Sequence, residues 1–288
     1  MGTHTEELIL PLSSIHPLPT PSHTLHDMAA LGAGTLPVSY GALTTIASLQ
    51  PNETILIHAA AGGLGIYAVQ IARALGAKVI GTVGSSDKKS IVESLLRDPK
   101  TGQIPPGEGV INYTTHTSWE KDVIQICKQV GKDGVDVVYD TVGLVTQSIR
   151  CTTFNGRIVV AGFAGRTGTG AQKVKELEMI AVNRILLKQI KLLGYRFGET
   201  GRRLPHETNK MWEGLNEMLK VRREGEAVIK PVVYKTYRGL GRVNEAMVAL
   251  RRREVVGKAV VEVCSEEEAV REVERGLEID KQGERAKL

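Results

Sequence analysis

Short apolar segments alternate with helical patterns through the centre of the chain. The apolar segments carry few charges, and apolar positions recur at helical spacing between them. Strands that are apolar on both faces are typical of a parallel sheet covered by helices on both sides. The pattern predicts six strands, at 54–58, 78–82, 110–112, 135–139, 157–161 and 190–194, with helices near 63–76, 86–96, 118–130, 144–150 and 174–187. This order predicts an α/β fold with a doubly wound parallel six-stranded sheet.

The two ends of the chain depart from this alternation. Residues 1–27 are rich in Pro, Ser, Thr and His and show little periodicity, and a helix is expected over 40–49. After Gly194 the pattern predicts a helix over 207–223, an extended segment at 228–234, a helix at 240–252 and a strand at 259–263. Residues 265–288 open on Ser265-Glu266-Glu267-Glu268, a capping-box pattern that predicts a charged terminal helix.

Composition and charge narrow the class of protein. The 288 residues are 42% hydrophobic and 24% charged, as in an ordinary globular protein. The sequence contains no apolar run of the roughly 20 residues that a membrane helix needs, and its start resembles no targeting signal, so a cytoplasmic location is expected. A net charge of +5 suits a small anionic ligand and is too weak to indicate nucleic acid. The three cysteines form no CxxC pair, which favours free thiols.

A glycine-rich turn separates the first two predicted strands. The turn reads Ala59-Ala60-Ala61-Gly62-Gly63-Leu64-Gly65 and leads directly into a predicted helix. Gly62 and Gly63 allow a pyrophosphate to approach the backbone, and the start of the helix offers free amides and a positive dipole end. Gly65 allows close packing of the helix on the strand. In its strand–turn–helix–strand context the turn predicts a dinucleotide site.

The end of the second predicted strand distinguishes between the two nicotinamide cofactors. NAD-binding proteins usually place an acid there, which bonds the ribose 2′-hydroxyl and would repel a 2′-phosphate. Here the stretch is Gly84-Ser85-Ser86, followed by Asp87, which we interpret as a helix cap, and by Lys88-Lys89. Hydroxyls and lysines suit a phosphate dianion, so the cofactor predicted is NADPH. The alternative is that both lysines are merely exposed on the helix.

Several further motifs are spread over residues 28–263. Beside the AxxGxxG form at Ala59, Gly62 and Gly65, they are Tyr40-Gly41-Ala42-Leu43, Gly81-Thr82-Val83-Gly84-Ser85, Val110-Ile111-Asn112-Tyr113, Asp140-Thr141-Val142-Gly143, Gly162-Phe163, Pro231-Val232-Val233-Tyr234 and Gly257-Lys258-Ala259-Val260-Val261. Together these motifs resemble the quinone oxidoreductase (zeta-crystallin-like) branch of the medium-chain dehydrogenase/reductase superfamily. The AxxGxxG form is fairly specific to this branch.

The resemblance assigns cofactor contacts to particular residues. It implies that Lys88 and Tyr113 hold the 2′-phosphate end with help from Ser85. It places Gly62, Gly63 and Leu64 along the pyrophosphate, Thr141 and Val142 beside the cofactor, and Ala161, Gly162 and Phe163 near the nicotinamide. There is an alternative to two of these cofactor contacts. Tyr113 could be a half-buried residue at the end of a strand, and Phe163 could belong to the hydrophobic core. His58 is expected to pack against the sheet rather than to do acid–base work.

The resemblance also shows where the chain departs from the family. The family has about 110–130 residues, forming a GroES-like barrel, before the point where the match begins, so the chain is interpreted as truncated at its N-terminus. The implied segments are a barrel remnant at 1–38, a Rossmann domain at 39–227, a return to the barrel at 228–264 and the charged tail at 265–288. Without the barrel, apolar residues at both ends are expected to face water or a second chain, namely Ile9, Leu10, Val232, Val233, Val260 and Val261.

Two further departures concern metal and loop length. Ala33 stands where the zinc-dependent branch has a cysteine ligand, and no four-cysteine loop is present, so no zinc is predicted. About ten extra residues around 98–108 are expected to bulge near the adenosine end.

The function that the resemblance implies is NADPH-dependent hydride transfer to a quinone or an α,β-unsaturated carbonyl. The chemistry resides mainly in the cofactor, and no catalytic residue is assigned. The alternatives are an enoyl reductase acting on acyl thioesters and a non-catalytic NADPH-binding fragment. The family resemblance also implies a homodimer formed through edge strands of the Rossmann sheet, with the strand at 190–194 as the candidate edge.

Overall fold

The computed structural model describes residues 24–31, 34–164, 179–220, 228–264 and 271. The chain forms two compact units, one made of Ala33–Lys230 and the other of Met1–Gly32 with Pro231–Leu288. The expected helices at the start of 174–187 and over 265–288 fall largely outside the described residues, as do Ile9 and Leu10.

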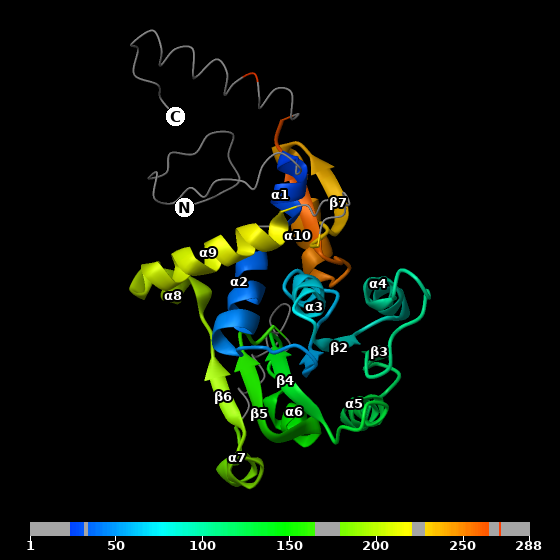
Figure 1. Ribbon diagram of the computed structural model, residues 1–288. Helices are drawn as coiled ribbons and strands as arrows, with labels where there is room; N and C mark the ends of the chain where they lie inside the picture. Colours follow the sequence, from blue (N-terminus) through cyan, green and yellow to red (C-terminus); the bar gives the residue numbers. More distant parts are fainter. Residues whose placement is uncertain (1–23, 32–33, 165–178, 221–227, 265–270, 272–288) are drawn as a thin grey trace. The chain divides into compact units, whose positions relative to one another are not determined.

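A six-stranded sheet forms the centre of the unit Ala33–Lys230, and every neighbouring pair of its strands is parallel. In spatial order the strands are β3 (Gly109–Asn112), β2 (Lys78–Val83), β1 (Thr54–Ile57), β4 (Val135–Asp140), β5 (Thr152–Val160) and β6 (Lys191–Gly194). Figure 1 shows β6 at one edge and β3 near the other. The doubly wound parallel sheet predicted from the apolar segments is confirmed.

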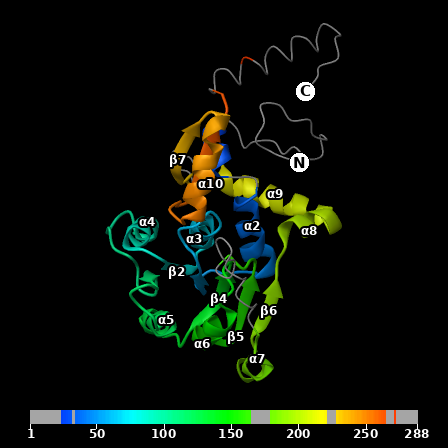
Figure 2. The same cartoon turned by 180° about the vertical axis from the view of Figure 1, so that it is seen from behind.

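Helices cover both faces of this sheet (Figures 1 and 2). On one face α3 (Gly65–Ala74) contacts both α2 (Leu36–Gly41) and α4 (Ser86–Leu96), and on the other α5 (Trp119–Lys128) contacts α6 (Val145–Cys151). Strands between two helical layers have no solvent-facing side, which explains why all four residues of β1 are buried. The remaining elements of the unit are the π-helical turn η2 (Ala42–Ile46), α7 (Val182–Lys188), α8 (Phe197–Arg203) and α9 (Pro205–Leu219).

Small residues let α2 approach its neighbours closely. A Cβ at Gly41 would collide with the Tyr195 hydroxyl and the Met211 sulfur, and a Cβ at Gly214 on α9 would collide with the Tyr40 hydroxyl. Helix formation begins at Leu36 rather than at residue 40, where the apolar pattern alone predicted it.

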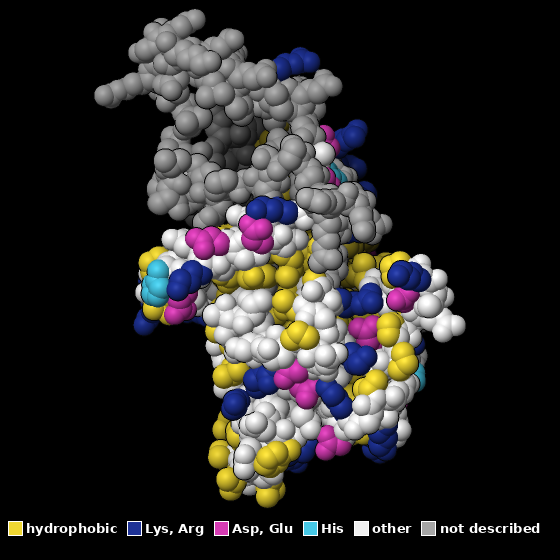
Figure 3. Space-filling model, in the orientation of Figure 1, with side chains coloured by type: hydrophobic (Ala, Val, Ile, Leu, Met, Phe, Trp, Pro, Cys, Tyr) yellow, Lys and Arg dark blue, Asp and Glu magenta, His cyan; other side chains and the backbone are white. Residues whose placement is uncertain are grey.

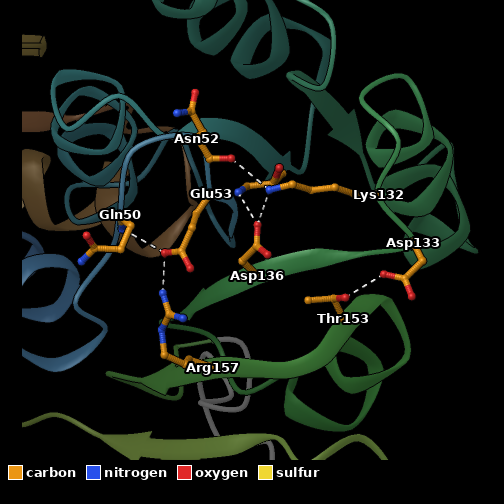
Figure 4. A network of polar contacts seen from close by, with 9 residues as sticks. Gln50, Asn52, Glu53, Lys132, Asp133, Asp136, Thr153 and Arg157 are labelled. Atoms are coloured by element: carbon orange, nitrogen blue, oxygen red, sulfur yellow. Dashed lines mark hydrogen bonds and ion pairs between the residues drawn. The ribbon is translucent and has the colours of Figure 1, made fainter.

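A polar network ties together the amino-terminal ends of the central strands (Figure 4). Glu53 accepts hydrogen bonds from the Gln50 amide at 2.9 Å and from the Arg157 guanidinium at 2.5 Å. Asp136 accepts from the Thr54 amide at 2.7 Å and from the Lys132 ammonium at 2.6 Å. These charged side chains bond one another and nearby backbone amides. We therefore interpret this edge of the sheet as one that stabilises the fold rather than one that binds a ligand.

The inserted loop at 98–108 also lies at the amino-terminal edge. Glu108 Oε1 accepts a hydrogen bond of 3.1 Å from the Val79 amide at the start of β2, and the Lys78 ammonium donates to the Pro106 carbonyl at 3.3 Å. The expectation that this loop bulges near the adenosine end is wrong. It precedes β3, and in a parallel sheet the segment before a strand lies at the edge opposite the carboxyl ends.

The second unit contains a two-stranded parallel sheet of β7 (Val233–Arg238) and β8 (Lys258–Glu262). Helices α1 (Leu25–Leu31) and α10 (Val243–Arg251) contact β8, and the 3-10 turn η3 (Leu240–Arg242) follows β7. Val260 is only 6% exposed, so the expectation that it faces water is wrong. Val260 lies in β8, the strand that both helices contact.

Candidate cofactor-binding site

All the cofactor residues predicted from sequence follow the carboxyl ends of β1 to β5. The strand order 3-2-1-4-5-6 reverses direction between β1 and β4. In open parallel sheets a ligand crevice forms outside the carboxyl ends at such a switch point. The structure therefore brings these residues to a single edge of the sheet, namely Gly62, Gly63, Leu64, Ser85, Lys88, Tyr113, Thr141, Val142, Ala161, Gly162 and Phe163.

The glycine turn is held tightly between β1 and α3. The Gly62 amide donates to the Ala59 carbonyl at 2.8 Å, and the Ala60 amide donates to the Thr82 carbonyl at 2.9 Å. A Cβ at Gly65 would overlap the Ala59 carbonyl oxygen and lie 2.8 Å from the Ala60 Cα. Gly65 is thus required by the backbone that precedes it. The turn places the N-terminus of α3 at the carboxyl end of β1, where the positive end of the helix dipole favours an anion.

A buried serine on α2 supports this turn. The Ser39 hydroxyl donates to the Leu64 carbonyl at 2.9 Å, and its oxygen lies 3.4 Å from the Tyr139 hydroxyl. Ser39 is fully buried. Sequence reasoning missed this residue because its partners lie 25 and 100 positions away.

Helix α4 begins directly at the end of β2. Ser85, not Asp87, is its N-cap, because the Ser85 hydroxyl oxygen accepts a hydrogen bond of 3.3 Å from the Lys88 amide. The interpretation of Asp87 as the cap is wrong, since Asp87 lies within the first turn and is exposed. The Ser85 hydroxyl proton remains available to a ligand, because the capping oxygen acts only as an acceptor.

Tyr113 completes the same corner from β3. Its amide donates to the Val83 carbonyl at 3.0 Å, and its hydroxyl oxygen lies 2.5 Å from the position that a Cβ of Gly84 would occupy. The side chain is 42% exposed. The structure thus places the Tyr113 phenol against Gly84, beside Ser85 and the start of α4.

The loop after β4 is held by a buried carboxylate. Asp140 accepts hydrogen bonds from the amides of Val142 and Gly143, both at 2.8 Å, and of Leu144 at 2.7 Å. Its side chain is completely buried. Sequence reasoning quoted Asp140 only as part of a motif. Its position immediately after an apolar strand and before Thr-Val-Gly was the available signal of a loop-capping acid.

The segment after β5 lies against this loop. The Ala161 amide donates to the Asp140 carbonyl at 2.8 Å, and the Ala164 amide donates to the Thr141 carbonyl at 3.1 Å. A Cβ at Gly162 would lie 3.0 Å from the Thr141 carbonyl oxygen. Phe163 is 50% exposed, so the alternative that it belongs to the core is wrong.

His58 lies in the core directly below the glycine turn. It is completely buried, and its ring meets Trp119 edge-on with the ring centres 4.9 Å apart. Burial lowers the pKa of His58, and the nearby Asp140 charge partly offsets the shift. The expectation that it packs against the sheet is confirmed. Among the described residues, no group of three or more His, Cys, Asp or Glu side chains is arranged to hold a metal.

A glycine turn opening a helix at the switch point of a doubly wound sheet defines a dinucleotide-binding domain of the Rossmann type. Residues 63–217 match the protein-family model described as "Zinc-binding dehydrogenase". The chain belongs to this family, in the quinone oxidoreductase branch of the medium-chain dehydrogenase/reductase superfamily.

Relatives of the chain carry names from the same branch. Quinone oxidoreductase-like protein 2 of Bos taurus is 31% identical over 236 residues, which cover 80% of this chain and 59% of that protein. Prostaglandin reductase-3 of Bos taurus is 28% identical, covering 91% of this chain and 64% of that protein. A crystal structure of quinone oxidoreductase from Pseudomonas syringae pv. Tomato DC3000 superposes with a TM-score of 0.70 at 26% identity, covering 91% of this chain and 72% of that one. The chain thus spans less than two thirds of the curated relatives named here.

Proposed function

We propose that the chain is an NADPH-dependent oxidoreductase that reduces a quinone or an α,β-unsaturated carbonyl without zinc. The observation that carries the cofactor assignment is the corner formed by Gly84, Ser85, Lys88 and Tyr113. The Ser85 and Tyr113 hydroxyls lie there and Lys88 belongs to the first turn of α4, whereas NAD-binding proteins typically have an acid at the end of this strand. The name of the bovine quinone oxidoreductase-like protein 2 supports a quinone as the acceptor.

The charge of the residues at this edge and the lack of side chains on the glycine turn support the proposed cofactor. Gly62, Gly63 and Leu64 would hold the pyrophosphate at the start of α3, while Ser85, Lys88 and Tyr113 would hold the 2′-phosphate. Thr141, Val142 and the segment Ala161–Phe163 would enclose the nicotinamide end. The bound nicotinamide would supply the hydride, and the chain's own part is to orient it and exclude water.

Cofactor titration tests this proposal. NADPH fluorescence and intrinsic tryptophan fluorescence are followed as the chain is titrated with NADPH and, separately, with NADH. We expect NADPH to bind at least about tenfold more tightly, because only NADPH places a dianion beside Lys88. Equal affinities would contradict the 2′-phosphate assignment.

Turnover with a simple quinone, an enone and an acyl-thioester enone separates the candidate activities. Preference for the thioester would favour the enoyl reductase alternative. NADPH binding without turnover of any acceptor would identify this chain as a binding module only.

Among the described residues, none of the helices combines the length and the hydropathy that a membrane-spanning helix requires.

We also propose that a second copy of the chain pairs with the β6 edge. β6 is the last strand of the sheet, and the preceding α7 exposes apolar side chains, with Val182, Leu186 and Leu187 each 74–75% exposed. Figure 3 shows hydrophobic side chains gathered at the end of the molecule where Figure 1 draws α7. The Lys188 ammonium holds α7 in place through the carbonyls of Ile149, Arg150 and Thr152 at 2.8–3.1 Å.

Sedimentation analysis tests this pairing. The wild-type chain is expected to sediment as a dimer, and a Leu186→Glu variant as a monomer, because the change places a charge within the apolar surface. A monomeric wild type at micromolar concentration would contradict the proposal.

A further inference from the structure

A line of hydrogen bonds runs through the buried interior behind the glycine turn. His58 Nδ1 lies 3.0 Å from Thr82 Oγ1, and His58 Nε2 lies 2.9 Å from Ser148 Oγ. The Ser148 hydroxyl in turn donates to the Leu144 carbonyl at 2.7 Å. His58 and Ser148 are completely buried, and Thr82 is 2% exposed. We call this line, from Thr82 through His58 and Ser148 to Leu144, the His58 relay.

The geometry of the relay fixes which ring nitrogen carries the proton. A serine hydroxyl has one hydrogen, and that of Ser148 is used on the Leu144 carbonyl. Ser148 Oγ can therefore only accept from His58, so His58 Nε2 is protonated. Nδ1 of the neutral ring must then accept from the Thr82 hydroxyl. All donors in the relay thus point the same way, from Thr82 toward Leu144.

The surroundings of the ring favour this neutral form. Burial lowers the pKa of His58, because a charged imidazolium would lose its hydration in the core. The Asp140 charge opposes this shift only in part. The Asp140 carboxylate already accepts hydrogen bonds from the amides of Val142, Gly143 and Leu144. His58 therefore acts as a neutral crosslink rather than as an acid or base.

Each member of the relay leads directly into a segment of the proposed cofactor site. His58 is followed at once by Ala59 and the glycine turn. Thr82 lies two positions before Gly84, in the strand that ends at the 2′-phosphate corner. Leu144, where the relay ends, is bound through its amide by Asp140, which also holds the Val142 amide. One imidazole thus joins three elements that carry different parts of the same site.

We propose that His58 is a positioning residue, whose neutral ring with its proton on Nε2 sets the spacing of the glycine turn, the β2 end and the loop after β4. This inference rests on the NADPH site proposed above. Because the ring is completely buried, His58 touches no cofactor and acts only through these three elements. Binding groups held about 1 Å out of place lose much of their effect, so a change in the relay should appear in cofactor affinity.

Substitutions at Thr82 test the proposal. Thr82→Val keeps the shape of the side chain but leaves Nδ1 without a donor, whereas Thr82→Ser keeps the hydroxyl. We expect Thr82→Val to raise the NADPH dissociation constant about fivefold or more, and Thr82→Ser to stay within about twofold of wild type. The matched control is Thr54→Val at the amino end of β1, where the buried hydroxyl has no hydrogen-bond partner within the described residues. It should leave NADPH affinity unchanged.

Two further measurements keep the proposal open to contradiction if Thr82→Val unfolds. Ser148→Ala removes the acceptor for Nε2 and should weaken NADPH binding by a similar factor. In the unmutated protein, a long-range ¹H–¹⁵N correlation spectrum of the His58 ring should show that Nε2 is protonated and Nδ1 is unprotonated. A ring protonated on Nδ1 would overturn the proposal.

The outcomes distinguish this inference from the proposed function. If the wild type does not bind NADPH, the proposed function fails. If the wild type binds NADPH and both Thr82→Val and Ser148→Ala bind it equally well at unchanged thermal midpoints, only the positioning role of His58 fails. Weaker binding in both variants, with Thr82→Ser and Thr54→Val close to wild type, supports the role.

Discussion

The hydroxyl oxygen of Tyr113 lies over Gly84, 2.5 Å from where a Cβ of that residue would stand. The contact joins the residue that follows β3 to the residue that follows β2. It leaves room for no side chain at position 84 unless the phenol moves. The proposed 2′-phosphate corner therefore depends on a glycine that itself offers no side chain to the ligand.

Gly84→Ala should weaken NADPH binding more than it weakens the fold. The new methyl group would displace the end of a half-exposed side chain rather than backbone, so the thermal midpoint should change by less than about 2 °C. We expect the NADPH dissociation constant to rise about three- to tenfold, equivalent to about one hydrogen bond. Fluorescence titration measures this. Tyr113→Phe removes the same hydroxyl, so the two changes should be less than additive when combined.

Lys88→Glu should raise the NADPH dissociation constant about tenfold or more, because an attraction for the 2′-phosphate becomes a repulsion. Lys89→Glu is the matched control, since Lys89 lies 3.7 Å from Glu93 in an ion pair along the helix. Affinity for NADH, which lacks the phosphate, should change little in either variant. An unchanged NADPH dissociation constant in Lys88→Glu would favour the alternative of an exposed helix lysine, and equal losses for NADPH and NADH would contradict a contact between Lys88 and the 2′-phosphate.

Local patterns were sufficient to predict the sheet and the segments at its carboxyl edge. The strand that begins at Thr54 continues as Ile55-Leu56-Ile57, and the glycines at 62 and 65 mark the turn after it. The predicted helix at 86–96 matches α4 at both ends, although its cap was assigned to Asp87 and is Ser85. Nearness in sequence did not suffice by itself, because Asp140 was missed although the amides that it binds are two to four positions away.

Residues whose partners are distant could not be predicted. Ser39 supports the turn through Leu64, 25 positions away, and Ser148 bonds His58, 90 positions away. The inserted loop was placed at the wrong edge because its direction depends on strand topology and not on composition. Val260 was expected to be exposed, but it is buried in β8, a strand that the distant segments α1 and α10 both contact.

Gly65→Ala should destabilise the whole domain. A Cβ there would overlap backbone atoms of Ala59 and Ala60, which cannot move without shifting the end of β1. Overpacking of this kind costs about 1–3 kcal/mol or more, so the urea midpoint should fall clearly. Gly198→Ala on α8 is the control, because nothing lies within 4 Å of its Cβ position and alanine favours a helix. An unchanged midpoint in Gly65→Ala would contradict the close packing of the turn.

Stability should fall at alkaline pH because of two buried thiols. Burial raises the pKa of Cys127 to about 11 and of Cys151 to about 12, from an ordinary value of 9.0. The folded state therefore holds these protons more tightly than the unfolded chain does. This contribution to stability is complete below pH 9 and is lost as pH rises from 9 toward 11–12.

Urea unfolding between pH 8 and 10.5 measures this dependence. The urea midpoint should decline above pH 9. Cys151→Ala should make this decline with pH less steep, even if the variant is less stable at every pH. Cys264 is exposed, so Cys264→Ser should leave the slope as in wild type. A flat profile through pH 10 would show that neither buried thiol resists ionisation in the fold.

Asp140→Asn should impair the nicotinamide half of the site more than the phosphate half. Asp140 accepts three backbone amides through two oxygens, with Leu144 on Oδ2 and both Val142 and Gly143 on Oδ1. An asparagine places an NH₂ donor against one of these donors, which releases part of the loop at a cost of about 1–3 kcal/mol. Because Thr141 and Val142 lie in that loop and Ser85 does not, binding of 2′,5′-ADP should be nearly unchanged while NADPH binds more weakly. Titration with both ligands separates the halves, and equal losses for the two would show that Asp140 supports the fold as a whole rather than this loop.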